Sequence, residues 1–283
     1  MNSNFLLMET ISQTLAGSTA VLNLLPLSME ELPKSSESSE SVVFKGHYPR
    51  VYDRELEPQD FYPSYIQTYI ERDVRMMKNI GDSNAFLQFV RLCAGRTGQI
   101  LNNSSLANDA GISPNTAKAW LAILESSFIV YRMQPYYKNF SKRLVKPPKL
   151  YFYDTGLACS LLGIRDAGQV AVHYLKGALF ENLVINEFIK RELNRGGQRR
   201  PWFWQDSQGK ETDCMLEIGS GLLPIEIKSG KTITTSYFDN LRYWQDLSGA
   251  GKDNSCVVYG GDQSLQTNSG KLVSWRDLQS IDY

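Results

Sequence analysis

The sequence has few of the side chains that usually bind zinc or form hydrolytic triads. Only two histidines occur among its 283 residues, His47 and His173, and neither has a ligand-like neighbour. The four cysteines lie far apart and form no C-x-x-C pair: Cys93, Cys159, Cys214 and Cys256. We therefore expect no zinc or redox site and no Ser-His-Asp triad. The cysteines are expected to be small buried residues in a reducing compartment.

Long apolar runs and an excess of one charge are also missing. No run approaches the length that spans a bilayer, and Met1 to Thr10 lack the basic segment of a signal peptide. We therefore expect a cytoplasmic chain with no membrane partner. Lys and Arg total 30, as do Asp and Glu, so the formal net charge is 0. This balance argues against a strongly basic nucleic-acid binder, although a local basic patch remains compatible with it.

The first part of the chain changes character several times. Residues 3–31 are rich in apolar side chains, whereas KSSESSES, from Lys34 to Ser41, is polar and is typical of an exposed linker. A long helix is predicted over Phe61–Ile80, where apolar residues recur about every 3.6 positions. A second helix is predicted near Ala85–Ala94.

The pattern of Ser104–Met133 predicts a helix-turn-helix followed by a strand. Gly111 can end the first helix with a positive φ, Ser113 can cap the second helix, and Pro114 suits its first position. The second helix has one apolar face: Ala117, Trp120, Leu121 and Leu124. Its first turn carries the residues expected to face bases: Asn115, Thr116 and Lys118. The alternative is a plain helical hairpin.

A basic segment follows the strand predicted at Phe128–Met133, which suggests a wing. Residues Lys138–Lys149 contain no acid and five cations: Lys138, Lys142, Arg143, Lys146 and Lys149. We expect this strip to face nucleic-acid phosphates. A solvated connector is the alternative.

The C-terminal half is predicted to alternate between helices and strands. A short strand over Leu150–Tyr153 and a helix over Gly156–Gly163 come first. The later elements are a helix over His173–Leu193, strands over Trp202–Gln205, Thr212–Ile218 and Leu223–Lys228, a helix over Ser236–Leu247, and a strand over Ser255–Tyr259. This αβββαβ order indicates a mixed α/β (α+β) domain with helices packed against a mixed sheet.

Four charged residues in this half are candidates for chemistry. Side chains alternate along a strand, so Glu226 and Lys228 share a face, ~7 Å apart. A short hairpin makes the preceding strand an antiparallel neighbour, and Asp213 can then converge with Glu226. Glu181 lies within an apolar helical stripe, where an unpaired carboxylate is costly.

Carboxylates that face one point bind Mg²⁺ or Mn²⁺, which prefer oxygen ligands. Such a metal can polarise a phosphodiester and activate water, and the lysine can orient that water. The alternative is a solvated strand face with alternating Glu and Lys.

Nearly the whole chain resembles the C-terminal part of a bacterial and archaeal AAA+ ATPase family. The stretches that carry the resemblance are SNFLLMETISQTLAGSTAVLNLLPLS, YIQTYIERDVRMM, GRTGQILNNSSLANDAGISPNTAKAWLAILE, KRLVKPPKLYFYDTGLA, KGALFENLVINEFIK and ETDCMLEI with LPIEIKSGK. The resemblance implies a winged helix followed by a PD-(D/E)xK, restriction-endonuclease-like domain. It also assigns the nuclease-like core to Glu181, Asp213, Glu226 and Lys228.

Two departures from the family separate this chain from an ATPase. No G-x-x-x-x-G-K-[ST] phosphate loop is present, so we expect no ATP binding or hydrolysis. The family usually has Arg after L-A-G, whereas this chain has Ser18. Both departures indicate a truncated product or a descendant of one. The expected organisation is an AAA+ remnant in 1–33, a linker in 34–60, a helical winged helix-turn-helix segment in 61–149 and a nuclease-like domain in 150–283.

Two functions stay open from the sequence. The first is a metal-dependent nuclease that binds nucleic acid through the winged helix, and the intact quartet favours it. The second is a non-catalytic module that binds DNA or a protein partner, or forms an oligomer, with the nuclease-like fold as its scaffold. The neutral net charge and the single cation of the predicted recognition helix, Lys118, favour the second. Fold alone cannot choose between them.

Overall fold

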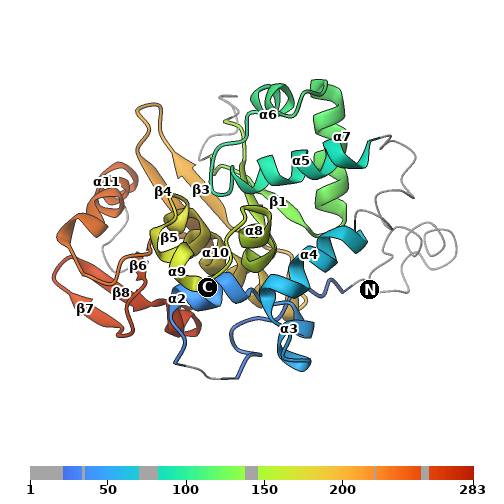
Figure 1. The fold of residues 1–283 in the computed structure, drawn as a ribbon. Coiled ribbons are helices and arrows are strands. Elements are labelled where there is room, and N and C mark those ends of the chain that lie inside the picture. Colours follow the sequence, from blue (N-terminus) through green and yellow to red (C-terminus); the bar gives the residue numbers. More distant parts are fainter. Residues whose placement is uncertain (1–21, 34–35, 70–81, 138–145, 220, 250–254) are drawn as a thin grey trace, which may run out of the picture.

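The chain folds into a mixed α/β structure, as predicted (Figure 1). The computed structural model describes residues 22–33, 36–69, 82–137, 146–219, 221–249 and 255–283. Most of the expected AAA+ remnant and the second half of the helix predicted at Phe61–Ile80 lie outside these residues. The N-terminal elements are α2 (Ser39–Lys45), α3 (Pro49–Asp53), α4 (Pro58–Tyr69), α5 (Ser83–Ala94), α6 (Asn103–Asp109), α7 (Pro114–Ser126), β1 (Val130–Met133) and β2 (Lys149–Phe152).

The linker predicted in residues 34–60 needs correction. This segment contains α2, α3 and the start of α4. The Ser38 side chain caps α2 by accepting a hydrogen bond from the backbone of Ser41. The helix then buries Val42 and Val43 in the main core. The serine-rich composition suggested a linker, but one of its serines caps a helix that has an apolar face.

The two helices and the turn predicted within Ser104–Met133 are confirmed in α6 and α7. Gly111 has a φ of +66°, and the Ser113 hydroxyl accepts a hydrogen bond from the backbone N–H of Thr116 at 3.0 Å. Pro114 is the first residue of α7. The predicted apolar face of α7 is buried: Ala117, Trp120, Leu121 and Leu124. In Figure 1, α5, α6 and α7 gather at one end of the molecule, and β6, β7, β8 and α11 lie at the other.

An antiparallel β1–β2 ribbon follows the helix-turn-helix. Val130 pairs with Phe152 and Met133 with Lys149. The chain beyond β1 then reaches the larger sheet, where Tyr136 donates its backbone N–H to the carbonyl of Phe203 at 2.7 Å. The ribbon therefore joins the helix-turn-helix to the C-terminal half, and the domain boundary predicted at residue 150 falls inside it.

The C-terminal half is built around a six-stranded sheet of order β3-β4-β5-β6-β8-β7. Its elements, with the helices before it, are α8 (Thr155–Leu161), α9 (Ala167–Val172), α10 (Lys176–Asn194), β3 (Trp202–Gln205), β4 (Glu211–Ile218), β5 (Gly221–Lys228), the 3₁₀ helix η2 (Thr235–Phe238), α11 (Asp239–Ser248), β6 (Cys256–Tyr259), β7 (Leu265–Thr267), β8 (Gly270–Ser274) and the 3₁₀ helix η4 (Trp275–Ser280). Strands β5, β6 and β8 run parallel to one another, and the other pairs are antiparallel. The order α10-β3-β4-β5-α11-β6 confirms the predicted αβββαβ sequence.

One continuous apolar core holds these parts together. It extends from Leu121 and Leu124 of α7 through Leu150 and Phe152 of β2 to Ile225 of β5. A smaller cluster lies between α11 and the sheet, formed by residues such as Phe238, Leu241 and Val257. The smaller cluster and the main core meet the sheet through alternating residues of β6, so both faces of its centre are covered.

Candidate active site

The β4–β5 pair positions the first two predicted site residues. The strands are antiparallel, and Cys214 pairs with Ile225. Continuing this register by one residue places Asp213 opposite Glu226. On its other side β4 is irregular: between the pairs Trp202–Met215 and Trp204–Thr212, one residue of β3 faces two of β4. This is the geometry of a β-bulge at Asp213, and bulges re-aim side chains next to functional sites.

Asp213, Glu226 and Lys228 form one connected group. The Lys228 ammonium (Nζ) lies 2.5 Å from Glu226 Oε1 and 3.7 Å from Asp213 Oδ2. Asp213 is buried and accepts a hydrogen bond from the backbone N–H of Ile227 at 2.7 Å. The structure thus brings these three predicted residues together, with one cation close to both carboxylates.

Glu226 is the most deeply buried member of this group. Its exposed fraction is 1%, and its Oε2 atom has no hydrogen-bond partner among the described residues. Asn240 of α11 donates to the other oxygen, Oε1, at 3.0 Å. Burial and the negative charge of Asp213 raise the pKa of Glu226 to about 8, although Lys228 opposes them. A buried carboxylate with one free oxygen is costly unless a further partner binds it.

Glu181 lies in a neighbouring group rather than in direct contact with these three. Lys149 Nζ is 3.3 Å from Glu181 Oε1, and the Tyr151 hydroxyl donates to the same oxygen. Lys149 also forms an ion pair with Glu211. Within the described ranges, no hydrogen bond or ion pair links Glu181 to Asp213, Glu226 or Lys228.

Electrostatics nevertheless connect the two groups. Burial and the charge of Asp213 raise the pKa of Glu181 to about 7 against the opposing effect of Lys149. Burial by itself would lower the pKa of Lys228, but Asp213 and Glu226 raise it, and Glu181 adds to their effect. Raised pKa values in neighbouring carboxylates are typical of functional sites.

The donor set suits a hard divalent cation, with carboxylates from two adjacent strands and a free oxygen on Glu226. Among the residues that the structure describes, no group of three His, Cys, Asp or Glu side chains is arranged to hold a metal ion. The protein ligands that fit are therefore the pair Asp213 and Glu226. Mg²⁺ commonly binds through one or two carboxylates and keeps several waters.

The predicted nucleic-acid contacts have different outcomes. Asn115 and Lys118 are exposed and Thr116 is half-buried in the first turns of α7, where they are available to a ligand. Lys142 and Arg143 lie outside the described residues. Lys146 is half-buried, and its ammonium donates to the carbonyl of Asp206.

For Lys149, the prediction of a phosphate-facing side chain is wrong. Its exposed fraction is 3%, and its ammonium is held by Glu181 and Glu211. The basic composition of Lys138–Lys149 gave no sign that its last residue starts a buried strand.

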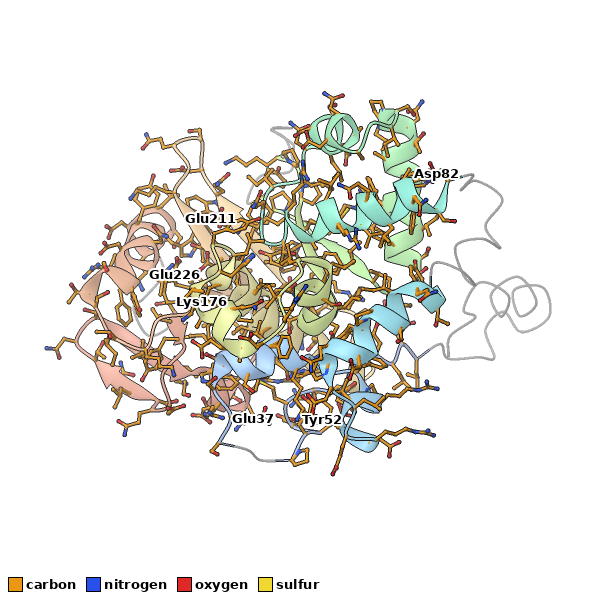
Figure 2. The ribbon with its side chains drawn as sticks, viewed as in Figure 1. Glu37, Tyr52, Asp82, Lys176, Glu211 and Glu226 are labelled. Atoms are coloured by element: carbon orange, nitrogen blue, oxygen red, sulfur yellow. The ribbon has the colours of Figure 1, made fainter. Side chains whose placement is uncertain are left out.

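Sequence reasoning missed three further residues of the site: Tyr151, Glu211 and Asn240. Glu211 stands two residues before Asp213, so it was visible as a nearby acid. Tyr151 and Asn240 come from other elements, β2 and α11, and only the tertiary fold brings them near. Figure 2 labels Glu211 and Glu226 on their strands.

A second buried charged group lies further along α10. Lys190 Nζ contacts Glu187 Oε1 at 2.9 Å, His47 Nδ1 at 2.7 Å and the carbonyl of Leu27 at 2.8 Å. The other oxygen of Glu187 accepts the backbone N–H of Met29 at 2.7 Å. Burial alone would raise the pKa of Glu187, but Lys190, His47 and the backbone N–H of Met29 together lower it to about 2.

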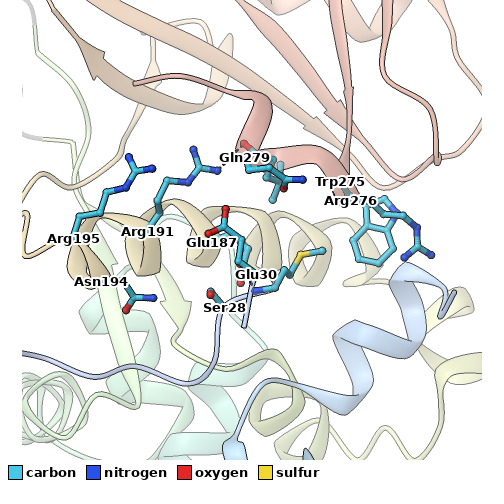
Figure 3. Close-up of a pocket in the computed structure, with 11 residues that line it drawn as sticks. Ser28, Glu30, Glu187, Arg191, Asn194, Arg195, Trp275, Arg276 and Gln279 are labelled. Atoms are coloured by element: carbon cyan, nitrogen blue, oxygen red, sulfur yellow. Dashed lines mark hydrogen bonds between the residues drawn. The ribbon is translucent and has the colours of Figure 1, made fainter. Parts of the chain in front are cut away.

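A cavity of about 110 Å³ adjoins this second group (Figure 3). Glu187 and Arg191 of α10 line it together with Ser28 and with residues of η4 such as Trp275 and Gln279. None of the four predicted catalytic residues lines it. The candidate site is therefore separate from this cavity.

No helix in the described part of the chain is both long and apolar enough to cross a membrane.

Residues 36–168 match the family model of a domain of unknown function, DUF8612, and residues 176–278 match a second domain of unknown function, DUF4143. The second match contains all four predicted catalytic residues. The gap between the two matches comes later than the boundary predicted at residue 150.

Two curated proteins are similar to the chain. It is 24% identical over 227 residues to "Uncharacterized protein Rv2008c" of Mycobacterium tuberculosis and, equally, to "Uncharacterized protein Mb2031c" of Mycobacterium bovis. The alignment covers 80% of this chain and 50% of each relative, so the chain spans about half the length of the curated relatives it matches. No solved structure matches it significantly.

Proposed function

We propose that the chain is a divalent-metal-dependent phosphodiesterase that acts on nucleic acid, with Asp213, Glu226 and Lys228 as its catalytic residues. The proposal includes descent from an AAA+ family protein without ATP binding in this chain. The helix-turn-helix and its ribbon would bind the nucleic acid. The αβββαβ order and the electrostatic group on β4 and β5 support this function.

The observation that carries the proposal is the position of the Lys228 ammonium between two buried carboxylates. It lies 2.5 Å from Glu226 and 3.7 Å from Asp213. Asp213 and Glu226 therefore lie close enough together for both to bind one cation. Glu226 still has one oxygen with no partner in the described structure. A divalent cation would satisfy that oxygen and lower the cost of two neighbouring buried acids.

Mg²⁺ or Mn²⁺, when bound, supplies charge that polarises a phosphodiester and lowers the pKa of water. Asp213 and Glu226 would hold it, and Glu181 would reach it through water. Ile227 would keep Asp213 oriented through its backbone N–H, and Asn240 would do the same for Glu226. Lys228 would turn from Glu226 to the phosphate oxygens, where an ammonium stabilises developing negative charge.

One observation favours a non-catalytic binding module as the second candidate. Lys228 already forms ion pairs with both carboxylates, and an ion-paired group of this kind can be structural. The exposed first turn of α7 offers one cation, Lys118, for a nucleic acid or protein partner.

A cleavage assay separates the two candidates. Single- and double-stranded DNA and RNA are incubated with the chain in Mg²⁺, in Mn²⁺ and in EDTA. We expect metal-dependent cleavage that Asp213→Asn and Lys228→Ala both abolish, with Lys271→Ala, an exposed lysine of β8, as the matched control for loss of a cation outside the site. Nucleic-acid binding without cleavage in either metal would support the second candidate and contradict the first.

A further inference from the structure

Lys149 is a buried lysine that the proposed chemistry does not use directly. It begins β2 and is 3% exposed, and its ammonium lies 5.3 Å from the centre of the Phe203 ring. Burial alone would lower the pKa of Lys149, but the negative charges of Glu181, Glu211 and Asp213 together raise it. The side chain is therefore a fixed positive charge held by two acids from different elements.

Tyr151 reinforces the same contact from the same strand. Residues two apart on a strand share a face, so Lys149 and Tyr151 both face α10. Both donate to Glu181 Oε1. The second oxygen of Glu181 accepts no hydrogen bond within the described residues. Residues of β2 thus hydrogen-bond one oxygen of the Glu181 carboxylate, and the other oxygen is available to a ligand.

The charge of Lys149 is what makes this position tolerable for Glu181. The negative charges of Asp213 and Glu211 both raise the pKa of Glu181, so they disfavour its ionised form there. Lys149 is the largest opposing influence. Lys149 and Tyr151 are also the side chains that hydrogen-bond Glu181 in the described structure, so they fix where its carboxylate lies.

Strand β2 also belongs to the ribbon that follows the helix-turn-helix. It pairs with β1 along its whole length, and β1 contacts α7. The residues that hold Glu181 therefore come from the segment proposed to bind nucleic acid, whereas Glu181 belongs to the segment proposed to cut it.

We propose that Lys149, assisted by Tyr151, is a positioning residue that fixes the Glu181 carboxylate and so couples the nucleic-acid-binding segment to the cleavage site. This inference rests on the proposed function and adds regulation to it. A ligand that shifts the ribbon would change the position of Glu181 without touching Asp213 or Glu226.

The test compares Lys149→Met, Lys149→Arg and Tyr151→Phe in the full chain. Partners that orient metal-site residues typically cost about 10- to 100-fold in metal affinity or activity when they are removed. We expect Lys149→Met to lower kcat by that factor with little change in KM. Lys149→Arg should recover most of the loss, and Tyr151→Phe should lose less. Lys271→Met is the matched control, because Lys271 lies exposed on β8 and contacts the Ser280 carbonyl instead.

Equal kcat for folded wild type and Lys149→Met would overturn the inference. A double-mutant cycle of Lys149→Met with Glu181→Gln provides a readout that needs no activity, namely the unfolding equilibrium constant in urea. We expect a coupling of about tenfold or more between the two positions. If the wild type neither binds metal nor cleaves, the proposed function fails by itself. Absence of coupling would overturn the positioning role even in an active enzyme.

Discussion

Helix α10 carries two buried glutamates, Glu181 and Glu187, whose surroundings differ in kind. Glu187 is matched on both oxygens, by Lys190 and by the backbone of Met29, and its pKa is lowered to about 2. Glu181 has partners on one oxygen, and its pKa is raised to about 7. A satisfied carboxylate stabilises its charged form through the fold, whereas an unsatisfied one costs stability and leaves capacity for a ligand.

The same contrast separates the two charged groups as a whole. The Glu187–Lys190–His47 group fastens the segment around Leu27 and Met29 to α10 through hydrogen bonds at both ends. The Asp213–Glu226–Lys228 group contains a buried oxygen with no partner among the described residues. We infer that the first group serves stability and the second serves binding, and the two should respond oppositely to substitution.

The largest effect is expected from Lys190→Met, which leaves Glu187 buried without its cation. Removing one partner of a buried ion pair typically costs about 3–5 kcal/mol. Urea unfolding of the variant should show a loss of that size. Glu181→Gln is the matched control on the same helix, and an equal loss there would break the distinction between the two glutamates.

The next effect is a loss of stability at low pH. Because the folded pKa of Glu187 is about 2, against an ordinary value of 4.5, its stabilising contribution is present above pH 4.5 and is lost as pH falls toward 2. The shift corresponds to about 3 kcal/mol. His47, whose pKa is lowered by burial and by Lys190, adds a loss that begins below pH 6.5. Unfolding free energies measured from pH 7 to 2 should fall less steeply below pH 4.5 in Glu187→Gln, and unchanged slopes would contradict this account.

Glu226→Gln should have a smaller effect on stability and the opposite sign. The substitution removes a buried acid whose ionised form the fold disfavours, so the variant should be as stable as the wild type or more stable, by about 1 kcal/mol. The same change should abolish divalent-metal binding. Thermal unfolding measures the stability, and calorimetry with Mn²⁺ measures metal binding. A strong loss of stability would show that Glu226, like Glu187, serves the stability of the fold.

The smallest effect on stability is expected from Lys118→Glu, on the exposed first turns of α7. Surface substitutions usually stay within about 0.5 kcal/mol. Nucleic-acid binding should nevertheless weaken for all sequences alike, and its dependence on salt should become shallower. Fluorescence anisotropy at several salt concentrations tests this, and unchanged binding would exclude α7 from the interface.

Local rules predicted much of the fold. The caps and turns around Gly111, Ser113 and Pro114 depend on neighbouring residues alone, so α6 and α7 could be located from the sequence. Strands β3, β4, β5 and β6 were visible because each is a short apolar or alternating segment bounded by turn residues. Strands β7 and β8 were missed, since they are short and are separated by polar and glycine residues that hide their pattern.

The candidate site was predicted only where a single strand pair sets it. Glu226 and Lys228 share a face by strand alternation, and the hairpin places Asp213 beside them. The bulge at Asp213 depends on pairing with β3. The contacts of Glu181 depend on Lys149 and Tyr151 of β2, which precede it by 32 and 30 residues. Sequence periodicity carries no information on such contacts, so Lys149 was expected at the surface and Asn240 was not expected at all.

The central claim is that Asp213 and Glu226 form a divalent-metal site beside Lys228. Calorimetric titration of the folded chain with Mn²⁺ tests it most directly, with Asp213→Asn, Lys228→Ala and Glu187→Gln measured alongside. The account predicts one binding event in the wild type, its loss in Asp213→Asn, and its retention in Lys228→Ala and Glu187→Gln. Absence of binding at millimolar Mn²⁺ in the wild type, or undiminished binding in Asp213→Asn, would contradict it.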